Sequence, residues 1–315
     1  MGRLSDVLVV NAGSTSLKLS VVDDAERSEA VASLGDASHV SAVAHRIVHG
    51  GSRFVEPTPI DDDVVAALHE LVELAPLHMR PALEALADAR RSLPHLPHVA
   101  VFDTAFHRTI PEHAATYALP SAWRARGIRR YGFHGLSVAW AVEQVQLPRL
   151  VVCHLGGGCS VTAVRDGRSV DTTMGFSPLE GVPMGTRAGS VDPGALLYLM
   201  QHGVSLSELE TGLERESGLR GLAGTNDVAE LVASREPNAH LALAVFSYRV
   251  AQAVAGMATA LGGIDAVVFT GGIGEHAGSV RETILEHLRF LGSFEVQVVA
   301  AREDVIAARA ARTLL

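Results

Sequence analysis

Residues 7–22 have the sequence Val7-Leu-Val-Val-Asn-Ala-Gly-Ser-Thr-Ser-Leu-Lys-Leu-Ser-Val-Val22. Apolar residues fill the first part, and in the last part they alternate with polar ones, which indicates two strands. The Gly and Ser residues between the two parts favour a tight turn. The segment therefore predicts a β-hairpin with a polar tip.

The same design recurs at Leu150-Val-Val-Cys-His-Leu-Gly-Gly-Gly-Cys-Ser-Val-Thr-Ala-Val164. Aligning His154 with Asn11 also aligns Gly156 with Gly13 and Cys159 with Ser16. Such self-similarity indicates an internal duplication. We therefore expect an α/β protein of two domains, residues 1–147 and 148–299.

Each hairpin begins a stretch in which apolar strands, at 99–102 and 266–270, alternate with amphipathic helical patterns. Helices are predicted over 61–74, 80–91, 193–202, 239–261 and 279–291. The acidic triplet Asp61-Asp62-Asp63 suits a helix N-terminus. In the last segment, 300–315, we expect an Ala-rich helix from Glu303 onward that packs on the first domain.

Composition indicates a well-packed globular protein, because 48% of the 315 residues are apolar and 19% are charged. The net charge of −9 disfavours nucleic acid and anionic membranes as partners. Cys153 and Cys159 lie in a Gly-rich segment with no secretory signal before them, so we expect free thiols and a cytoplasmic location. We find no apolar stretch of membrane-spanning length, and expect no membrane span.

Three glycine-rich elements are candidates for phosphate binding. The two hairpin tips could offer backbone N–H groups to phosphate from opposite sides of a cleft. Either tip alone is more simply explained as an ordinary turn, but the repetition favours function. A third element, 267–275, follows an apolar strand and precedes a helix, and it matches neither the P-loop nor the dinucleotide-binding pattern. A helix cap is its structural alternative.

Four charged side chains lie beside turns or strand ends: Arg46, Asp103, His134 and Arg187. Asp103 follows the apolar run 99–102, and ligands of open α/β sheets bind at the carboxyl ends of strands. Each residue alone is more often structural. Together they suit phosphoryl transfer to a carboxylate, because this reaction needs cations to neutralise charge and no general base to activate the nucleophile.

At these residues the chain resembles the acetate kinase family, which belongs to the sugar kinase, Hsp70 and actin superfamily. The matching strings follow the family order and span most of the chain: Asn11-Ala-Gly-Ser-Thr-Ser-Leu-Lys18, His45-Arg-Ile-Val-His-Gly-Gly51, Ala75-Pro-Leu-His78, Val101-Phe-Asp-Thr-Ala-Phe-His107, Tyr131-Gly-Phe-His-Gly135, Val170-Asp-Thr-Thr-Met-Gly-Phe-Ser-Pro-Leu-Glu-Gly181, Met184-Gly-Thr-Arg187 and Phe269-Thr-Gly-Gly-Ile-Gly-Glu275.

The resemblance implies a duplicated actin-like (ribonuclease H-like) ATPase fold with a central cleft. It implies reversible phosphoryl transfer between ATP and acetate, giving ADP and acetyl phosphate, with Mg²⁺ or Mn²⁺ as cofactor and a homodimer as the assembly. The catalytic residues that it implies are Asp103, His134, Arg187 and Arg46. The metal-binding residues that it implies are Asn11 and Glu303.

The resemblance also assigns the substrate sites. The acyl group would contact Arg46, His78, Val48, Leu77, Phe133 and Pro178. The phosphate path would be lined by Ser14, Ser16 and Lys18. The nucleotide would contact His154, Leu155, Gly156, Gly157, Gly158, Asp227, Val228, Ala229, Gly271, Gly272, Ile273, Gly274, Glu275 and His276.

Departures from the family leave alternatives open. The family usually has Arg where this chain has Ala229, so a planar cation suited to stacking on a base is missing, and pyrophosphate or another nucleotide could be the donor. It usually has Asn at Gly157, at Met79 and at His276, and Asp at Ser190. The loop at 154–158 is also similar to that of butyrate kinases, so propionate or butyrate could be the acyl substrate.

A non-catalytic binding descendant of the family is the third possibility, because a fold does not fix a function. The presence of Arg46, Asp103, His134, Arg187 and Glu303 argues against it. The chain is also shorter than a typical member of the family, which we attribute to trimmed peripheral structure.

Overall fold

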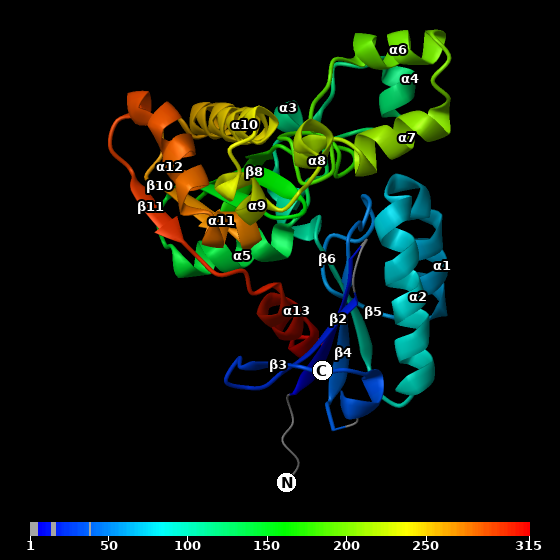
Figure 1. Cartoon of the computed structure of the whole chain (residues 1–315). Helices are drawn as coiled ribbons and strands as arrows, with labels where there is room; N and C mark the ends of the chain where they lie inside the picture. Colours follow the sequence, from blue (N-terminus) through cyan, green and yellow to red (C-terminus); the bar gives the residue numbers. More distant parts are fainter. Residues whose placement is uncertain (1–5, 14–16, 38) are drawn as a thin grey trace. The chain divides into compact units, whose positions relative to one another are not determined.

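The computed structural model describes residues 6–13, 17–37 and 39–315, and they form two compact units (Figure 1). Unit 1 comprises Met1–Arg108, Phe133–Trp140 and Arg302–Leu315, and unit 2 comprises Thr109–Gly132 and Ala141–Ala301. Thus Thr109–Gly132, which precedes the predicted boundary at 147/148, lies in unit 2. The C-terminal segment lies in unit 1, as predicted.

Unit 1 is built on a sheet with the strand order β3-β2-β1-β4-β6-β5. Strands β1 (Val7–Ala12) and β2 (Leu17–Val22) form the predicted antiparallel hairpin, and β3 (Ser28–Ala30) extends it. Strands β4 (Ala42–Ile47) and β6 (His98–Phe102) run parallel to β1, and the short β5 (Thr58–Pro59) closes the far edge. Two 3₁₀ turns, η1 (Leu34–Ala37) and η3 (Ala105–Thr109), lie in the connections.

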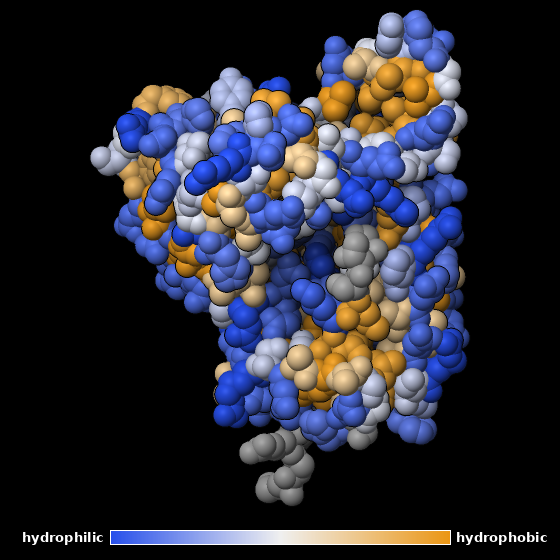
Figure 2. All heavy atoms as spheres, viewed as in Figure 1, coloured by the Kyte–Doolittle hydropathy of each residue, from blue (hydrophilic) through white to orange (hydrophobic). Residues whose placement is uncertain are grey.

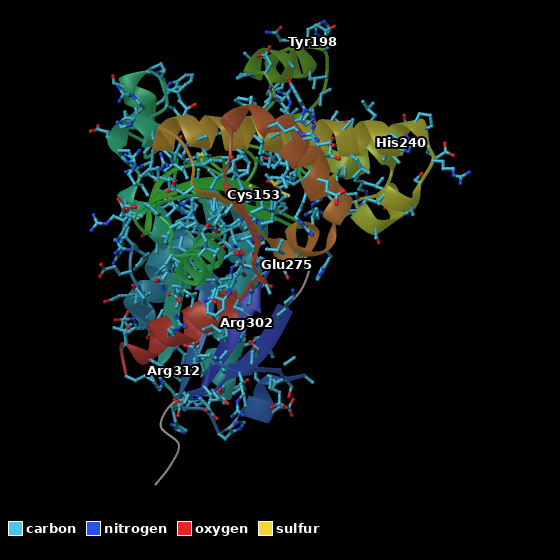
Figure 3. The ribbon with its side chains drawn as sticks, turned by 90° about the vertical axis from the view of Figure 1, so that its left-hand side faces the viewer. Cys153, Tyr198, His240, Glu275, Arg302 and Arg312 are labelled. Atoms are coloured by element: carbon cyan, nitrogen blue, oxygen red, sulfur yellow. The ribbon has the colours of Figure 1, made fainter. Side chains whose placement is uncertain are left out.

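Helices cover both faces of this sheet, because successive strand residues point to opposite sides. Val7 and Val9 of β1 pack with α13 (Glu303–Arg312), whereas Leu8 and Val10 pack on the α2 (Pro76–Ser92) side. Figure 3 labels Arg302 and Arg312 at the two ends of α13. Helix α1 (Asp62–Glu70) and η2 (Val72–Leu74) lead into α2. Helix α13 thus covers one face of the sheet of unit 1.

Unit 2 repeats the plan with the order β11-β10-β7-β8-β9. Strands β7 (Arg149–Leu155), β8 (Cys159–Arg165) and β9 (Arg168–Thr172) form an antiparallel meander that corresponds to β1-β2-β3. Strands β10 (Ala266–Thr270) and β11 (Glu295–Val298) run parallel to β7, as β4 and β6 do to β1. The matching strand orders support the predicted duplication.

Helix α10 (Pro237–Leu261) is the largest helix of unit 2 and packs on β7, β8 and β9. Contrary to our expectation, it is long and apolar enough to cross a membrane by length and composition. Its buried side, which includes Phe246 and Val250, identifies it as a core helix.

The remaining helices are α3 (Glu112–Ala115), α4 (Ser121–Arg124), α5 (Gly135–Gln144), α6 (Pro193–Gln201), α7 (Leu206–Arg215), α8 (Gly218–Ala223), α9 (Val228–Ala233), α11 (Gly271–His276), α12 (Gly278–His287) and the 3₁₀ turn η4 (Arg289–Leu291).

The predicted helices are confirmed with shifted ends. Asp61 is the N-cap of α1, where its side chain accepts a hydrogen bond from Val64 N. Helix α2 begins at Pro76 instead of residue 80, because Pro76 occupies the first turn, where a proline is tolerated. The second proline, Pro81, lies inside the helix. The segment 206–233, for which we predicted no helix, contains α7, α8 and α9.

Candidate active site

An ionic cluster lies at the carboxyl ends of the central strands of unit 1, around the Arg46 side chain. Arg46 binds Asp103 through two hydrogen bonds, Nε to Oδ1 at 3.0 Å and Nη2 to Oδ2 at 2.5 Å. Its Nη1 donates to Asn11 Oδ1 at 2.9 Å and lies 3.6 Å from Glu303 Oε2. Asn11 Nδ2 lies 3.5 Å from the same Glu303 oxygen. The structure thus brings together four residues that are distant in sequence.

Sheet register explains this meeting. Asn11 of β1 pairs with Arg46 of β4, and Asp103 follows β6, so the three residues end adjacent parallel strands. Glu303 is the first residue of α13, which packs on the same strands. On the other side of Asn11, the exposed Lys18 of β2 is its antiparallel partner.

The Arg46–Asp103 pair is largely removed from solvent, since the two side chains are 14% and 1% exposed. Burial acts against the charge of Arg46, but the carboxylates of Asp103 and Glu303 outweigh it and raise the pKa of the guanidinium. Arg46 is therefore a permanent cation held in a fixed orientation.

His134 is positioned by an unusual backbone at the start of α5. Its φ of +60° lies in the left-handed region that non-glycine residues rarely adopt. The next residue, Gly135, donates from its backbone N to Asp103 O at 2.9 Å, and a Cβ there would lie only 2.2 Å from that oxygen. Gly135 therefore lets the His134 segment approach Asp103 closely.

The predicted acyl-site residues of unit 1 lie in three elements. Val48 and Phe133 are buried, whereas Leu77 and His78, in the first turn of α2, are partly exposed. Phe133 packs edge-on against the His49 ring, with 5.5 Å between the ring centroids. Its backbone oxygen lies 2.9 Å from His107 Nε2.

Arg187 and Pro178 belong to unit 2, in the connection between β9 and α6. Arg187 Nη1 donates to Pro178 O at 3.4 Å and lies 3.8 Å from Met184 Sδ. Burial lowers the pKa of Arg187, and the carboxylate of Glu214 opposes this shift. The two residues that the resemblance assigns to the acyl side of unit 2 are thus in contact.

A cavity of about 660 Å³ in unit 2 collects most of the predicted nucleotide residues. Of these, the ones that line it are Gly156, Gly157, Asp227, Val228, Ala229, Gly272, Ile273 and His276. Our sequence reasoning missed the other lining residues, which are Gly185, Asn226, Val232, Ala277, Gly278 and Ser279. Of these, Asn226 and Ala277 adjoin a predicted residue in sequence, and for these two that proximity was the only available signal.

The other predicted nucleotide residues form the frame of this cavity. Gly271 has φ +78°, and a Cβ there would lie 2.8 Å from Leu155 O. The Glu275 side chain accepts hydrogen bonds from the backbone N of Gly271 and of Ala301, both at 3.0 Å, so it holds the loop instead of lining the cavity. Gly158 O accepts from Gly156 N at 3.0 Å. His154 ends β7 beside Thr270, and Gly274 lies buried in α11.

Ser14 and Ser16, predicted for the phosphate path, lie outside the described residues. Within the described part of the chain, no group of three or more His, Cys, Asp or Glu side chains is arranged to hold a metal ion. Asn11 and Glu303 nevertheless offer an amide and a carboxylate oxygen in one cluster, which is the donor chemistry that Mg²⁺ prefers. The donor set fits a hard cation whose remaining ligands come from phosphate and water.

Each unit has a sheet of the same strand order that begins with a hairpin; unit 1 adds the cluster around Arg46, and unit 2 adds the glycine-lined cavity. This duplicated α/β fold is that of a phosphotransferase. The model of the acetokinase family matches residues 29–312. The chain belongs to the acetokinase family.

Known relatives agree with this membership. The acetate kinase of Deinococcus radiodurans is 52% identical over 82% of this chain and 69% of its own length, and that of an Arthrobacter species is 43% identical over 91% and 86%. A propionate kinase from Francisella tularensis superposes with a TM-score of 0.92 at 33% identity, covering 97% of this chain and 98% of its own. The acetate kinase of Porphyromonas gingivalis superposes with a TM-score of 0.85 at 30% identity, covering 98% of this chain and 99% of its own.

Proposed function

We propose that this chain is an acetate kinase that reversibly transfers the terminal phosphoryl group of ATP to acetate. The observation that carries the proposal is the Arg46 cluster: a permanent cation, two carboxylates and an amide at the ends of three strands and one helix. A carboxylate nucleophile and a phosphoryl group are both anionic, so their meeting requires oriented positive charge.

Within this reaction the residues have distinct roles. Asp103 fixes the guanidinium of Arg46, which neutralises the acyl carboxylate and the transferred phosphoryl group. Arg187 supplies a second cation, and His134 donates to phosphoryl oxygens. His78 assists from the start of α2. Acetate needs no general base, because it is already ionised at neutral pH.

Asn11 and Glu303 would hold Mg²⁺ or Mn²⁺, with Lys18 beside Asn11 in the hairpin. When bound, the cation neutralises charge on the phosphate oxygens. Two protein ligands suffice, since Mg²⁺ commonly takes its other ligands from substrate phosphate and water.

We propose ATP as the donor, held in the glycine-lined cavity of unit 2. The cavity combines glycines, which expose their backbone N–H groups, with the apolar side chains of Val228, Ala229, Val232 and Ile273. The glycines suit phosphates, whereas the apolar side chains suit a nucleobase. At about 660 Å³ it has the size of a nucleotide site, which pyrophosphate would fill poorly.

The four acyl-site side chains, Val48, Leu77, Phe133 and Pro178, would contact the methyl group of acetate. We propose that propionate is a poorer substrate and butyrate a worse one, because each added methylene must displace packed atoms. The structural similarity to a propionate kinase makes propionate the alternative to test first.

We further propose a cytoplasmic homodimer. Helix α6 exposes a run of apolar side chains, Leu197, Tyr198, Leu199 and Met200, each at least 40% exposed. An orange patch lies at the upper right of Figure 2, where Figure 1 places α6, and Figure 3 labels Tyr198 on this helix. Contiguous exposed apolar surface of this kind marks interaction sites. Light scattering tests this proposal: we expect the wild-type protein to be a dimer and the Leu197→Glu variant to be a monomer.

A coupled assay tests the function as a whole. Acetate, propionate and butyrate are compared, each with ATP, GTP and pyrophosphate as donor. We expect the highest kcat/KM with acetate and ATP. Turnover of butyrate in preference to acetate would refute the acyl assignment, and turnover with pyrophosphate in preference to ATP would refute the donor assignment.

A further inference from the structure

The loop that carries Arg187 is fixed to the junction of α7 and α8. Its backbone and one hydroxyl make five hydrogen bonds with this junction. They are Ala188 N to Leu213 O (3.1 Å), Thr186 Oγ1 to Glu214 O (2.9 Å), Ser217 N to Thr186 O (3.0 Å), Leu219 N to Met184 O (3.0 Å) and Arg220 N to Gly185 O (3.0 Å). The backbone position of Arg187 therefore depends on these two helices.

Gly218 shows how close the approach is. It adopts φ +63°, and a Cβ at this position would lie 2.1 Å from Met184 O and 2.7 Å from Arg187 O. A side chain at 218 would push the arginine loop away, so the junction is built to hold Arg187 in place.

Glu214, in the last turn of α7, adds a charge to this support. Its Oε2 is buried and has no hydrogen-bond partner among the residues that the structure describes. A buried carboxylate oxygen without a partner destabilises a fold by about 1 to 3 kcal/mol, so stability gives no reason for an acidic residue here.

The electrostatic partner of Glu214 is Arg187. Burial raises the pKa of the Glu214 carboxyl. The positive charges of Arg187 and Arg215 oppose this rise, whereas the negative charge of Glu210 adds to it. Burial lowers the pKa of Arg187, and among the charges that oppose this shift Glu214 comes first and Cys159 second. The two groups thus attract each other, although burial outweighs this attraction at both of them.

We propose that Glu214 is a positioning residue for Arg187. Its carboxylate, presented by α7 beside the arginine loop, attracts the guanidinium toward α7, while the five hydrogen bonds fix the backbone. Arg46 shows the same principle in a tighter form, since Asp103 binds it through two hydrogen bonds. The inference rests on the proposed function, in which Arg187 neutralises the phosphoryl group.

The first test compares Glu214→Gln with Glu210→Gln. Gln keeps the size of the side chain and removes its charge, and the exposed Glu210 lies one turn earlier on the same helix. We expect E214Q to lower kcat about tenfold with little change in the KM for ATP, because one partly buried charge interaction is lost. E210Q should behave as wild type. The melting temperature of E214Q should stay equal or rise.

The pH profile gives a second readout that a purely structural residue would not move. Because the pKa of Glu214 is raised, wild-type kcat should begin to fall at a pH above the usual carboxyl range as Glu214 takes up a proton. E214Q should lack this acid limb, and Glu214→Asp should restore it in part. An unchanged acid limb in E214Q would overturn the proposal, as would a loss of kcat that parallels a loss of thermal stability.

A third readout does not depend on turnover. The Nε–Hε NMR signal of Arg187, assigned with Arg187→Lys, should exchange with water faster in E214Q than in E210Q, because the guanidinium is held less firmly. Equal exchange rates would refute the role of Glu214. If the wild-type protein had no acetate kinase activity, the proposed function would be refuted. The exchange rates in E214Q and E210Q would still decide the role of Glu214, because they do not depend on turnover.

Discussion

At the scale of single residues, the two arginines assigned to catalysis differ in what removal would do to the fold. Arg46 is the direct partner of Asp103, which is 1% exposed, whereas Arg187 has its loop fixed by backbone hydrogen bonds. Removing Arg46 leaves a buried carboxylate without its counter-ion, which is strongly destabilising.

We predict that Arg46→Ala lowers kcat by about 10² or more and also lowers the melting temperature. The double variant R46A/D103N should regain stability without regaining activity, because the buried charge has been removed but the cation is still missing. Arg187→Ala should lower kcat similarly and lower the melting temperature less than Arg46→Ala, because removal of Arg46 also breaks its bidentate pair with the buried Asp103. Assays and thermal melts of the three variants check this, and an active R46A/D103N would contradict the role of Arg46.

His45 provides a prediction about pH. It is 1% exposed, its Nε2 lies 2.9 Å from His98 Nδ1, and its Nδ1 has no hydrogen-bond partner. Burial, followed by the charges of His98 and Arg90, lowers the pKa of His45 from 6.5 to about 3. Protons therefore bind the unfolded state first as the pH falls below 6.5, and stability is lost between this pH and about 3.

The expected loss from His45 alone is about 2 kcal/mol between pH 7 and pH 5. Urea unfolding at the two pH values measures it, with His45→Gln as the test and the exposed His202→Gln as the control. The pH dependence should shrink in H45Q and stay unchanged in H202Q. Equal pH dependence in all three proteins would show that His45 is not the responsible group.

Val48 tests the acyl site. Val48→Ala removes two methyl groups from a buried position, so it should raise kcat/KM for propionate relative to acetate by about tenfold and leave the KM for ATP unchanged. Competition of the two acids in one assay measures this ratio directly. An unchanged ratio would remove Val48 from the acyl site.

At the scale of elements, the hairpins and the glycine loop after β10 were predictable, because period-two alternation and glycine turns are local signals. The helices α7 to α9 were not predicted, although Ser205 and Glu208 form a capping box at the start of α7. This signal was present in the sequence and we did not use it. The contact of Arg46 with Asp103 was beyond prediction, because it depends on the register of β4 against β6.

Helix α13 is expected to be essential for unit 1. Val305 is fully buried and belongs to the same cluster as Val7, Val9, Val99 and Val101. Val305→Asp should lower the free energy of unfolding by about 3 kcal/mol or more, because it buries a charge without a partner. The exposed Thr313→Asp is the matched control. Denaturant unfolding compares the two, and equal stability would show that α13 contributes little to this core.

At the scale of the whole molecule, the two units share a strand order and differ in chemistry. Unit 1 presents the ionic cluster and the proposed metal ligands, whereas unit 2 presents the glycine-lined cavity. The duplication could be read from the sequence. The packing of the C-terminal segment on the first domain was also expected. The place of Thr109–Gly132 in unit 2 could not be predicted, because it depends on contacts between residues distant in sequence.

Dependence on a divalent cation is a prediction about the activity of the whole chain. Exhaustive chelation should abolish phosphoryl transfer, and Mg²⁺ or Mn²⁺ should restore it. Asn11→Ala and Glu303→Gln should raise the cation concentration needed for half-maximal rate. Full turnover in the presence of excess chelator would refute the metal assignment.

The place of α13 also affects how the protein is made. A ribosome synthesises the strands of unit 1 first, yet the helix that covers one face of their sheet is synthesised only after unit 2. At about 5 to 20 residues per second, this apolar face stays uncovered for roughly 10 to 40 seconds. Unit 1 therefore completes its core only after unit 2 has been synthesised, and the nascent chain must be protected from aggregation until then.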